Sequence, residues 1–255
     1  MDEKLPYDDC QRPVGWVQPR QRCARLRRNV LRIVGVVALL WCLHQLLFPS
    51  PTISCRFPYQ EALRGTELKV PLEAHIMSKC PDAKDCLQKL VLPTMANASD
   101  KIDFKLSFIG RTTDHDDGVE CPHGQTECLG DIIELCAATL YPDPKIYLGF
   151  AMCLTRDYSE IPQRSLVEDC ALEHGIDFGK LNDCSSKDDG AYGIRLLRES
   201  VERSNDLDVH ISCTVRLADK VRCVRDGGQW KDCDDGAEPE DLIRDVNSLY
   251  ENGEH

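Results

Sequence analysis

The stretch Lys69–Cys86 reads KVPLEAHIMSKCPDAKDC and decides the fold. Its first half, Lys69–Met77, alternates apolar and polar side chains, which is the pattern of a β-strand. Its second half begins a helix, because Pro81 suits the first helical position, where a fixed φ and a missing N–H cost nothing. We expect this helix to run to about Leu92 and to stop at Pro93.

A second alternating stretch, Lys101–Gly110, follows this helix. Strand, helix and strand in this order predict two parallel strands joined by a right-handed crossover. The expected later elements are helices 129–141, 147–154, 166–174 and 191–204, strands 209–217 and 221–224, and a last amphipathic helix 238–250. This order is typical of an α/β, thioredoxin-like domain that carries a cysteine-rich helical insertion.

An apolar segment, Ile33–Phe48, precedes this domain and follows six arginines. Positive charge before an apolar segment predicts a cytosolic N-terminus. The segment is short for a bilayer, so a cleaved signal peptide is the alternative, but the long polar tail favours an uncleaved N-terminal transmembrane helix. We therefore expect a cytosolic basic tail at 1–32, a transmembrane signal-anchor at 33–48, a stalk at 49–66, and a lumenal thioredoxin-like domain at 67–255 with its insertion at about 111–187.

Charge and cysteine content indicate which partners and which compartment suit this chain. Residues 1–55 carry a net charge of +4 and the remaining residues carry −16. The domain after residue 55 is therefore acidic and would repel nucleic acid. The chain has 15 cysteines, a number typical of oxidising compartments. They include no CxxC pair, so we expect no metal site, and we expect no cofactor. Asn97-Ala98-Ser99 is a sequon, which predicts glycosylation of Asn97 on the lumenal side.

A compact motif, CPHGQTEC, spans Cys121–Cys128. It resembles the C-Q-H-G-x-x-E-C signature of the gamma-interferon-inducible lysosomal thiol reductase family, with Pro122 in place of the usual Gln. Further cysteines follow at spacings similar to that family's, namely Cys136, Cys153, Cys170 and Cys184. The resemblance covers about residues 70–204. It implies a thioredoxin-like fold and reduction of protein disulfides in acidic endosomal or lysosomal compartments.

The resemblance also implies that this motif is not where the redox chemistry occurs. We expect its cysteines to form structural disulfides, and His123, Gly124 and Glu127 to hold a tight loop. The candidates for structural disulfides are Cys121, Cys128, Cys136, Cys153, Cys170, Cys184, Cys213, Cys223 and Cys233.

In the family, Cys80 would match the nucleophilic cysteine. A thiolate at a helix N-terminus is stabilised by free N–H groups and the helix dipole. The second cysteine of the family's CxxC pair is missing, because Ala83 stands in its place. Cys86 is the nearest substitute, but on a regular helix it lies roughly 9 Å along the axis and is turned away from Cys80. Asp82 adds a negative charge that opposes thiolate formation.

Thioredoxin-like reductases also carry a cis-proline that faces the nucleophile, and residues 210–215 contain no proline, so Ser212 or a neighbour takes that place. Two functions stay open. One is a lumenal thiol–disulfide oxidoreductase that reduces protein disulfides through Cys80, with Cys86, Cys213 or an external thiol resolving the mixed disulfide. The other is a catalytically degenerate thioredoxin-like protein that binds lumenal client proteins. No GxSxG or HExxH motif supports a hydrolase.

Overall fold

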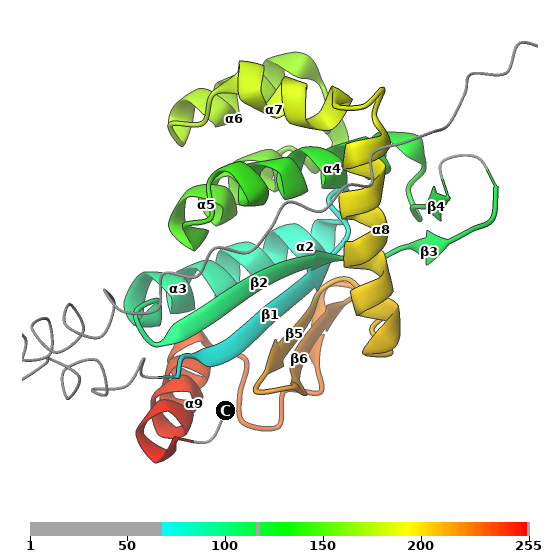
Figure 1. Ribbon diagram of the computed structural model, residues 1–255. Helices are drawn as coiled ribbons and strands as arrows, with labels where there is room; N and C mark the ends of the chain where they lie inside the picture. Colours follow the sequence, from blue (N-terminus) through cyan, green and yellow to red (C-terminus); the bar gives the residue numbers. More distant parts are fainter. Residues whose placement is uncertain (1–67, 116–117, 254–255) are drawn as a thin grey trace, which may run out of the picture. The chain divides into compact units, whose positions relative to one another are not determined.

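The computed structural model describes residues 68–115 and 118–253 (Figure 1). The predicted basic tail, signal-anchor and stalk, residues 1–66, therefore lie outside the described residues, as do Cys10, Cys23, Cys42 and Cys55. Within the described ranges, no helix has both the length and the apolar character needed to cross a bilayer.

A five-stranded sheet forms the centre of the domain, in the order β2-β1-β5-β6-β7. The strands β1 (Val70–Ile76) and β2 (Ile102–Phe108) are parallel, with Val70 opposite Ile102 and Ile76 opposite Phe108. The strands β5 (Thr214–Leu217), β6 (Lys220–Asp226) and β7 (Gln229–Lys231) continue the sheet in antiparallel order on the other side of β1. The predicted parallel β-α-β unit and its later antiparallel hairpin are thus confirmed.

The crossover helix is longer than predicted. It comprises α2 (Pro81–Cys86), a π-helical segment (Leu87–Val91) and α3 (Leu92–Ala98), so the prediction that Pro93 ends the helix is wrong. The π-helical turn is the reason, because the N–H of Leu92 donates to the carbonyl of Leu87, five residues back. This wider turn gives the proline ring room, and Pro93 lies in the first turn of α3.

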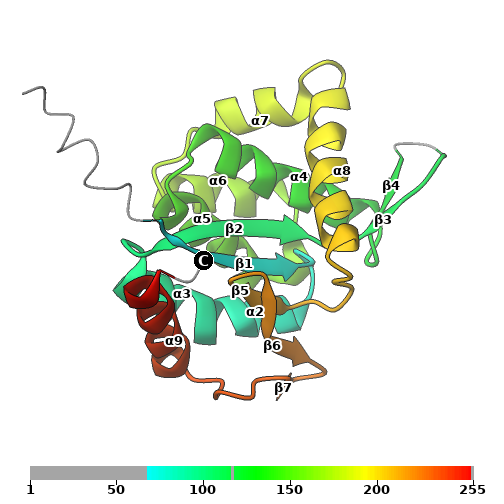
Figure 2. The same ribbon diagram turned by 60° about the horizontal axis from the view of Figure 1, so that its bottom comes forward.

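The helical insertion lies beside the β2 edge of the sheet in both views (Figures 1 and 2). It begins with the short hairpin β3 (Arg111–Thr112) and β4 (Val119–Glu120). The helices α4 (Gln125–Leu140), α5 (Pro144–Arg156), α6 (Arg164–Glu173) and α7 (Phe178–Ser186) follow, with a 3-10 turn at Tyr158–Glu160. Of these helices, α7 was not predicted.

Two more helices cover the sheet. The helix α8 (Ala191–Asp206) packs on β2, and α9 (Pro239–Asn252) packs beside α3 and contacts β1 (Figure 2). All residues of β1 except Pro71 are consequently buried. Its apolar side chains alternate with Glu73 and His75, so the polar set of this strand is buried as well as the apolar set.

The buried polar set of β1 is held by α8 and β5. Arg203 donates two hydrogen bonds to the Glu73 carboxylate, and His75 Nδ1 lies 2.9 Å from Ser204 Oγ. Arg216 lies opposite Glu73 in the sheet, with Nη1 3.9 Å from the same carboxylate. The predicted alternation is correct, but both faces of the strand are covered by helices, as is usual where strands are parallel.

Ten of the described cysteines form disulfides. The pairs are Cys86–Cys213, Cys121–Cys128, Cys136–Cys184, Cys153–Cys170 and Cys223–Cys233. All nine candidates for structural disulfides are therefore bonded, and the remaining partner is Cys86. Among the described residues, Cys80 alone is a free cysteine.

Candidate redox site

Cys80 lies at the junction between β1 and the crossover helix. It is the N-cap residue of α2, with extended backbone angles, and Pro81 takes the first helical position. Its N–H donates to the carbonyl of Met77 at 3.0 Å, which closes a tight turn after the strand. The residue is partly exposed. The structure thus places a free, partly exposed sulfur at the start of the helix.

Ser212 is the residue that faces this sulfur. Cys80 Sγ lies 3.8 Å from the carbonyl oxygen of Ser212, and the Ser212 hydroxyl accepts a hydrogen bond of 2.9 Å from the N–H of Met77. The peptide bond between Ser212 and Cys213 is cis. The segment expected to take the place of the family's cis-proline therefore lies against Cys80. It precedes β5, which begins at Thr214 and not at Val209 as predicted.

Cys86 does not meet Cys80 in the structure. It is fully buried, and its sulfur is bonded to Cys213, with the two Cα atoms 6.2 Å apart. In this cysteine state Cys86 offers no thiol that could resolve a mixed disulfide at Cys80. Cys86, one of the three candidates to resolve Cys80, is instead bonded from α2 to the residue that precedes β5.

Asp82, which was expected to oppose a thiolate at Cys80, has its own partners. Its two carboxylate oxygens accept hydrogen bonds of 2.9 Å from the backbone N–H groups of Gly227 and Gly228. Both glycines have positive φ, which places their N–H groups in the turn between β6 and β7. Arg225 Nε lies 3.7 Å from the same carboxylate. The charge of Asp82 is therefore offset by the hairpin, a contact between residues some 145 apart in the chain.

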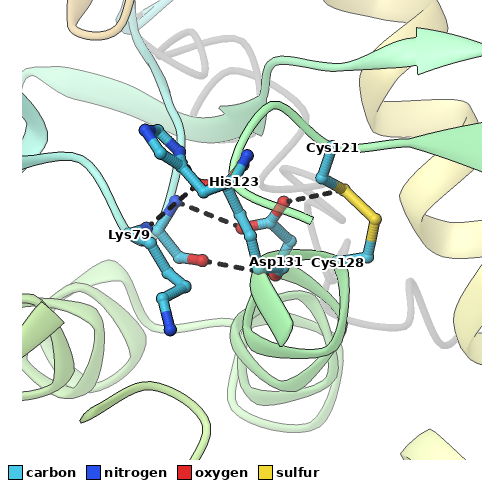
Figure 3. The surroundings of a disulfide bond; sticks show 7 residues. Lys79, Cys121, His123, Cys128 and Asp131 are labelled. Atoms are coloured by element: carbon cyan, nitrogen blue, oxygen red, sulfur yellow. Dashed lines mark hydrogen bonds and ion pairs between the residues drawn. A yellow bond between two sulfur atoms is a disulfide. The ribbon is translucent and has the colours of Figure 1, made fainter. Parts of the chain in front are cut away.

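The CPHGQTEC motif lies next to Lys79, the residue before Cys80 (Figure 3). His123 donates its backbone N–H to Glu127, and its ring Nδ1 bonds to the same carboxylate. Gly124 has a φ of 86°, which explains why glycine is needed at this bend. The Glu127 carboxylate also accepts the N–H of Lys79, the residue before Cys80. The tight loop predicted for His123, Gly124 and Glu127 is present, and it also holds the Cys80 turn in place.

Lys79 adds a second link to the insertion. Its ammonium group donates to the carbonyl oxygens of Ser159 and Ile161, at 3.2 and 2.7 Å, and approaches the Thr126 hydroxyl at 3.4 Å. These three contacts restrict the conformation of the Lys79 side chain. They therefore hold the backbone at Lys79 and Cys80 against the helical insertion. No sequence signal identified this role.

Two further acidic side chains of α4 are buried near the same turn. Asp131 accepts the N–H of Ser78 at 3.2 Å, and its other oxygen lies 3.7 Å from Cys121 Sγ (Figure 3). A disulfide sulfur carries no proton, so a hydrogen bond here requires a protonated Asp131. Burial and the charge of Glu127 raise the pKa of Asp131 well above its usual value. Glu134 is 1% exposed, and burial together with the charges of Asp131 and Glu127 raises its pKa in the same way.

These two acids predict greater stability in acid. An acid whose pKa is raised by folding binds its proton more tightly in the folded chain. Its contribution to stability is fully present below the pKa that the acid has in the unfolded chain, about 4. The contribution is lost as the pH rises towards the higher pKa that the acid has in the folded chain. We expect the full chain to resist urea better at pH 5 than at pH 7. Glu134→Gln, which cannot ionise, should gain stability relative to the wild type as the pH rises from 5 to 7.

The matched control for this prediction is Glu199→Gln, which removes an exposed carboxylate from α8. It should follow the wild-type pH dependence, because an exposed acid has similar surroundings in the folded and unfolded chain. Identical pH dependence in the wild type and Glu134→Gln would show that Glu134 does not contribute to the acid stabilisation.

Two other candidate features lie away from Cys80. Asn97 is exposed in the last turn of α3, and its amide donates to the Pro93 carbonyl at 2.8 Å, so its glycosylation stays a prediction. Cys153, Glu173 and His174 bring three potential metal ligands together. Cys153 is bonded to Cys170, however, so its sulfur is not available as a thiolate ligand.

The chain matches the family model for gamma interferon inducible lysosomal thiol reductase (GILT) over residues 71–174. No curated protein is similar enough to match. Among solved structures, it is similar to oxidised BdbD from Bacillus subtilis (13% identity, 71% of this chain and 88% of that chain, TM-score 0.47). It is also similar to the thiol-disulfide exchange protein alpha-DsbA2 from Wolbachia pipientis (17% identity, 72% of this chain and 84% of that chain, TM-score 0.46). A third similar structure is ScsC from Proteus mirabilis (12% identity, 90% of this chain and 95% of that chain, TM-score 0.46). These scores are too low to transfer any residue's role to this chain.

Proposed function

Because the chain belongs, through residues 71–174, to the gamma interferon inducible lysosomal thiol reductase family, we propose that it is a thiol–disulfide oxidoreductase that reduces protein disulfides through Cys80. The observation that carries this proposal is the state of Cys80. It is the one described cysteine left unpaired when ten others are bonded, and it is partly exposed at the start of a helix. A structural cysteine in an oxidising compartment is ordinarily paired.

The proposed reaction begins with attack of the Cys80 thiolate on one sulfur of a client disulfide. The thiolate is the reactive form of a cysteine in such an exchange. The attack gives a mixed disulfide between Cys80 and the client and releases the other client sulfur as a thiolate. Asp82 would disfavour the anion, but its charge is directed to Gly227, Gly228 and Arg225, which leaves the helix N-terminus to act on the sulfur.

A groove supports the same proposal, because it offers space for a client beside the site. Its volume is about 300 Å³, and its lining includes Met77 and His210. Met77 bonds to both Cys80 and Ser212, and His210 is two residues before Ser212. An extended client segment in this groove would lie next to the two segments that face each other across the Cys80 sulfur. The groove also includes Arg111 and Glu120, so its rim carries charges of both signs.

We further propose that the domain works in an acidic lumen of the vacuole, lysosome or secretory pathway, or outside the cell, attached to the membrane through residues 33–48. The five disulfides support an oxidising compartment. The raised pKa values of Asp131 and Glu134 support an acidic one, since both acids stabilise the folded chain when protonated.

Client binding without redox turnover is the second candidate. Two observations favour it, namely the absence of a cysteine at position 83 and the bonded state of Cys86. Under this alternative the domain keeps the thioredoxin-like surface but lacks a working pair of thiols. The groove beside Met77 would then serve for binding alone.

Alkylation of Cys80 separates the two candidates. If Cys80 is a nucleophile, iodoacetamide at pH 5 should modify it in the native full chain at least about tenfold faster than in the urea-unfolded chain, because only the folded helix N-terminus stabilises the thiolate. Peptide mass mapping identifies the modified residue. Equal or slower modification of the native chain would favour the client-binding alternative.

A further inference from the structure

We propose that Cys80, Cys86 and Cys213 form a three-cysteine relay, in which Cys213 resolves the mixed disulfide at Cys80 and Cys86 then resolves Cys213. This inference rests on the proposed function and supplies the step that the missing CxxC pair leaves open. In it, the described arrangement, with a free Cys80 and a Cys86–Cys213 bond, is the oxidised form of the relay.

The first support is that the sulfurs of Cys80 and Cys86 both contact the dipeptide Ser212-Cys213. The Cys80 sulfur lies 3.8 Å from the carbonyl oxygen of Ser212, in the peptide group that leads directly to Cys213. The Cys86 sulfur is bonded to Cys213 itself. Cys86 lies six positions after Cys80 along the helix, which turns the two side chains away from each other. Cys213, which lies just before β5 and is bonded to α2, is therefore suited to exchange disulfides with both Cys80 and Cys86.

The second support is that hydrogen bonds hold the Ser212-Cys213 segment and the turn at Cys80 in place. The backbone N–H and carbonyl of Cys213 bond to Arg225 of β6, at 3.0 and 2.8 Å. Met77 bonds to Ser212 Oγ through its N–H and to the Cys80 N–H through its carbonyl. The turn that carries Cys80 is thus tied through Met77 to the segment that carries Cys213, and that segment is itself bonded to β6. Thiol–disulfide exchange requires such close and stable placement of the attacking sulfur.

The third support is the difference in exposure among the three cysteines. Cys80 is partly exposed, whereas Cys86 and Cys213 are fully buried. An external thiol or a client can therefore reach only Cys80, and electrons must pass between solvent and the buried pair through it. In a purely structural role, the buried Cys86–Cys213 bond would exchange with nothing.

The reduced relay carries thiols at Cys80, Cys86 and Cys213. Cys80 attacks one sulfur of the client disulfide, which becomes bonded to Cys80, and the other client sulfur leaves as a thiol. Cys213 then attacks the Cys80 sulfur and breaks its bond to the client. That break releases the client as a dithiol and forms a Cys80–Cys213 bond.

Cys86 completes the cycle by attacking Cys213, which frees the Cys80 thiol and forms the Cys86–Cys213 bond. Two electrons and two protons have passed from the buried pair to the client. The reductant that restores the relay is a low-molecular-weight thiol, two molecules of which are oxidised to one disulfide. It acts by the reverse route, through the Cys80–Cys213 intermediate.

The test compares the native wild-type full chain with Cys80→Ser at pH 7 in excess reduced glutathione. Samples are quenched with an alkylating reagent and mapped by mass spectrometry. We expect the Cys86–Cys213 bond to open at least about tenfold faster in the wild type, because external thiol enters through Cys80. The Cys136–Cys184 bond serves as an internal control that should open equally slowly in both proteins. Cys80→Ser removes no disulfide, so folding of the variant is not at risk.

A second arm traps the intermediate. Cys86→Ser removes the last thiol of the relay, so it should accumulate a Cys80–Cys213 bond under mild oxidation. The matched control, Cys223→Ser with Cys233→Ser, removes the neighbouring disulfide and should leave Cys80 free. Equal opening of Cys86–Cys213 in wild type and Cys80→Ser, or free thiols at both Cys80 and Cys213 in Cys86→Ser, would overturn the relay.

These outcomes are distinct from failure of the proposed function. If Cys80 forms a mixed disulfide with a client but the two arms fail, an external thiol resolves Cys80 and only the relay is wrong. If Cys80 forms no mixed disulfide with a client, the oxidoreductase proposal itself is wrong.

Discussion

Cys80→Ser is expected to lower the rate of insulin-disulfide reduction by the full chain on the order of 10³-fold or more, to the rate of the thiol reductant alone. A hydroxyl is a far weaker nucleophile towards a disulfide than a thiolate, and in this site no other described sulfur is both free and accessible. The measurement is turbidity of reduced insulin, with a thiol such as glutathione as electron source.

The substitution should leave the fold unchanged, because Cys80 makes no disulfide and the N-cap role of its side chain is not used. Unfolding curves of the variant should therefore match those of the wild type. The pair Cys223→Ser with Cys233→Ser controls for general loss of cysteines, and it should retain most of the activity. Full activity in Cys80→Ser would exclude this residue as the nucleophile, whereas wild-type activity no higher than that of the thiol alone would leave the client-binding alternative.

The sequence predicted the central β-α-β unit well because its signals are local. Alternation in β1 and β2 and the proline at the helix start depend only on neighbouring residues. Pro93 was misjudged because proline normally removes a hydrogen bond of the helix, and only a π-helical turn at Leu87–Val91 makes it compatible. Nothing in LQKLV signals that turn, since it depends on how the helix packs between the sheet and α9.

The candidate site was predictable only in part. Cys80 and its place at the helix start follow from the order of strand, cysteine and proline. The Cys86–Cys213 bond joins residues 127 apart, and the Asp82 hydrogen bonds reach Gly227 and Gly228 across a similar separation. Spacing along the chain cannot fix such contacts, because they arise from the antiparallel addition of β5 and β6 beside β1.

The acidic side chains show a related limit. Glu127, Asp131 and Glu134 follow one another on α4 at helical spacing, which would ordinarily mark a solvated face. In the structure this face lies against the turn that carries Cys80, and all three are buried. The insertion therefore does more than lengthen the domain, since Glu127 and Asp131 of α4 bond to the backbone that leads to Cys80.

Glu73→Gln is expected to lower the free energy of unfolding at pH 7 by about 3 kcal/mol, because it removes the negative charge from a buried cationic cluster. Glu73 is 4% exposed and holds Arg203, with His75 Nε2 at 3.3 Å. Burial alone would raise the pKa of Glu73, but the hydrogen bonds from His75 and Arg203 outweigh it and lower the pKa to about 2. One pKa unit corresponds to about 1.4 kcal/mol, which gives a loss of the stated size.

The pH dependence of this loss identifies its cause. A carboxylate with a lowered pKa contributes stability that is fully present above the unfolded value of about 4.5 and is lost as the pH falls towards 2. The difference between wild type and Glu73→Gln, measured by urea unfolding, should therefore be constant from pH 5 to pH 7 and shrink below pH 4.5. Glu120→Gln is the control, because its ion pair with Arg111 is exposed and such pairs contribute at most about 1 kcal/mol. A loss at Glu73 that stays the same at pH 3 would mean that packing, and not the charge, stabilises this part of the sheet.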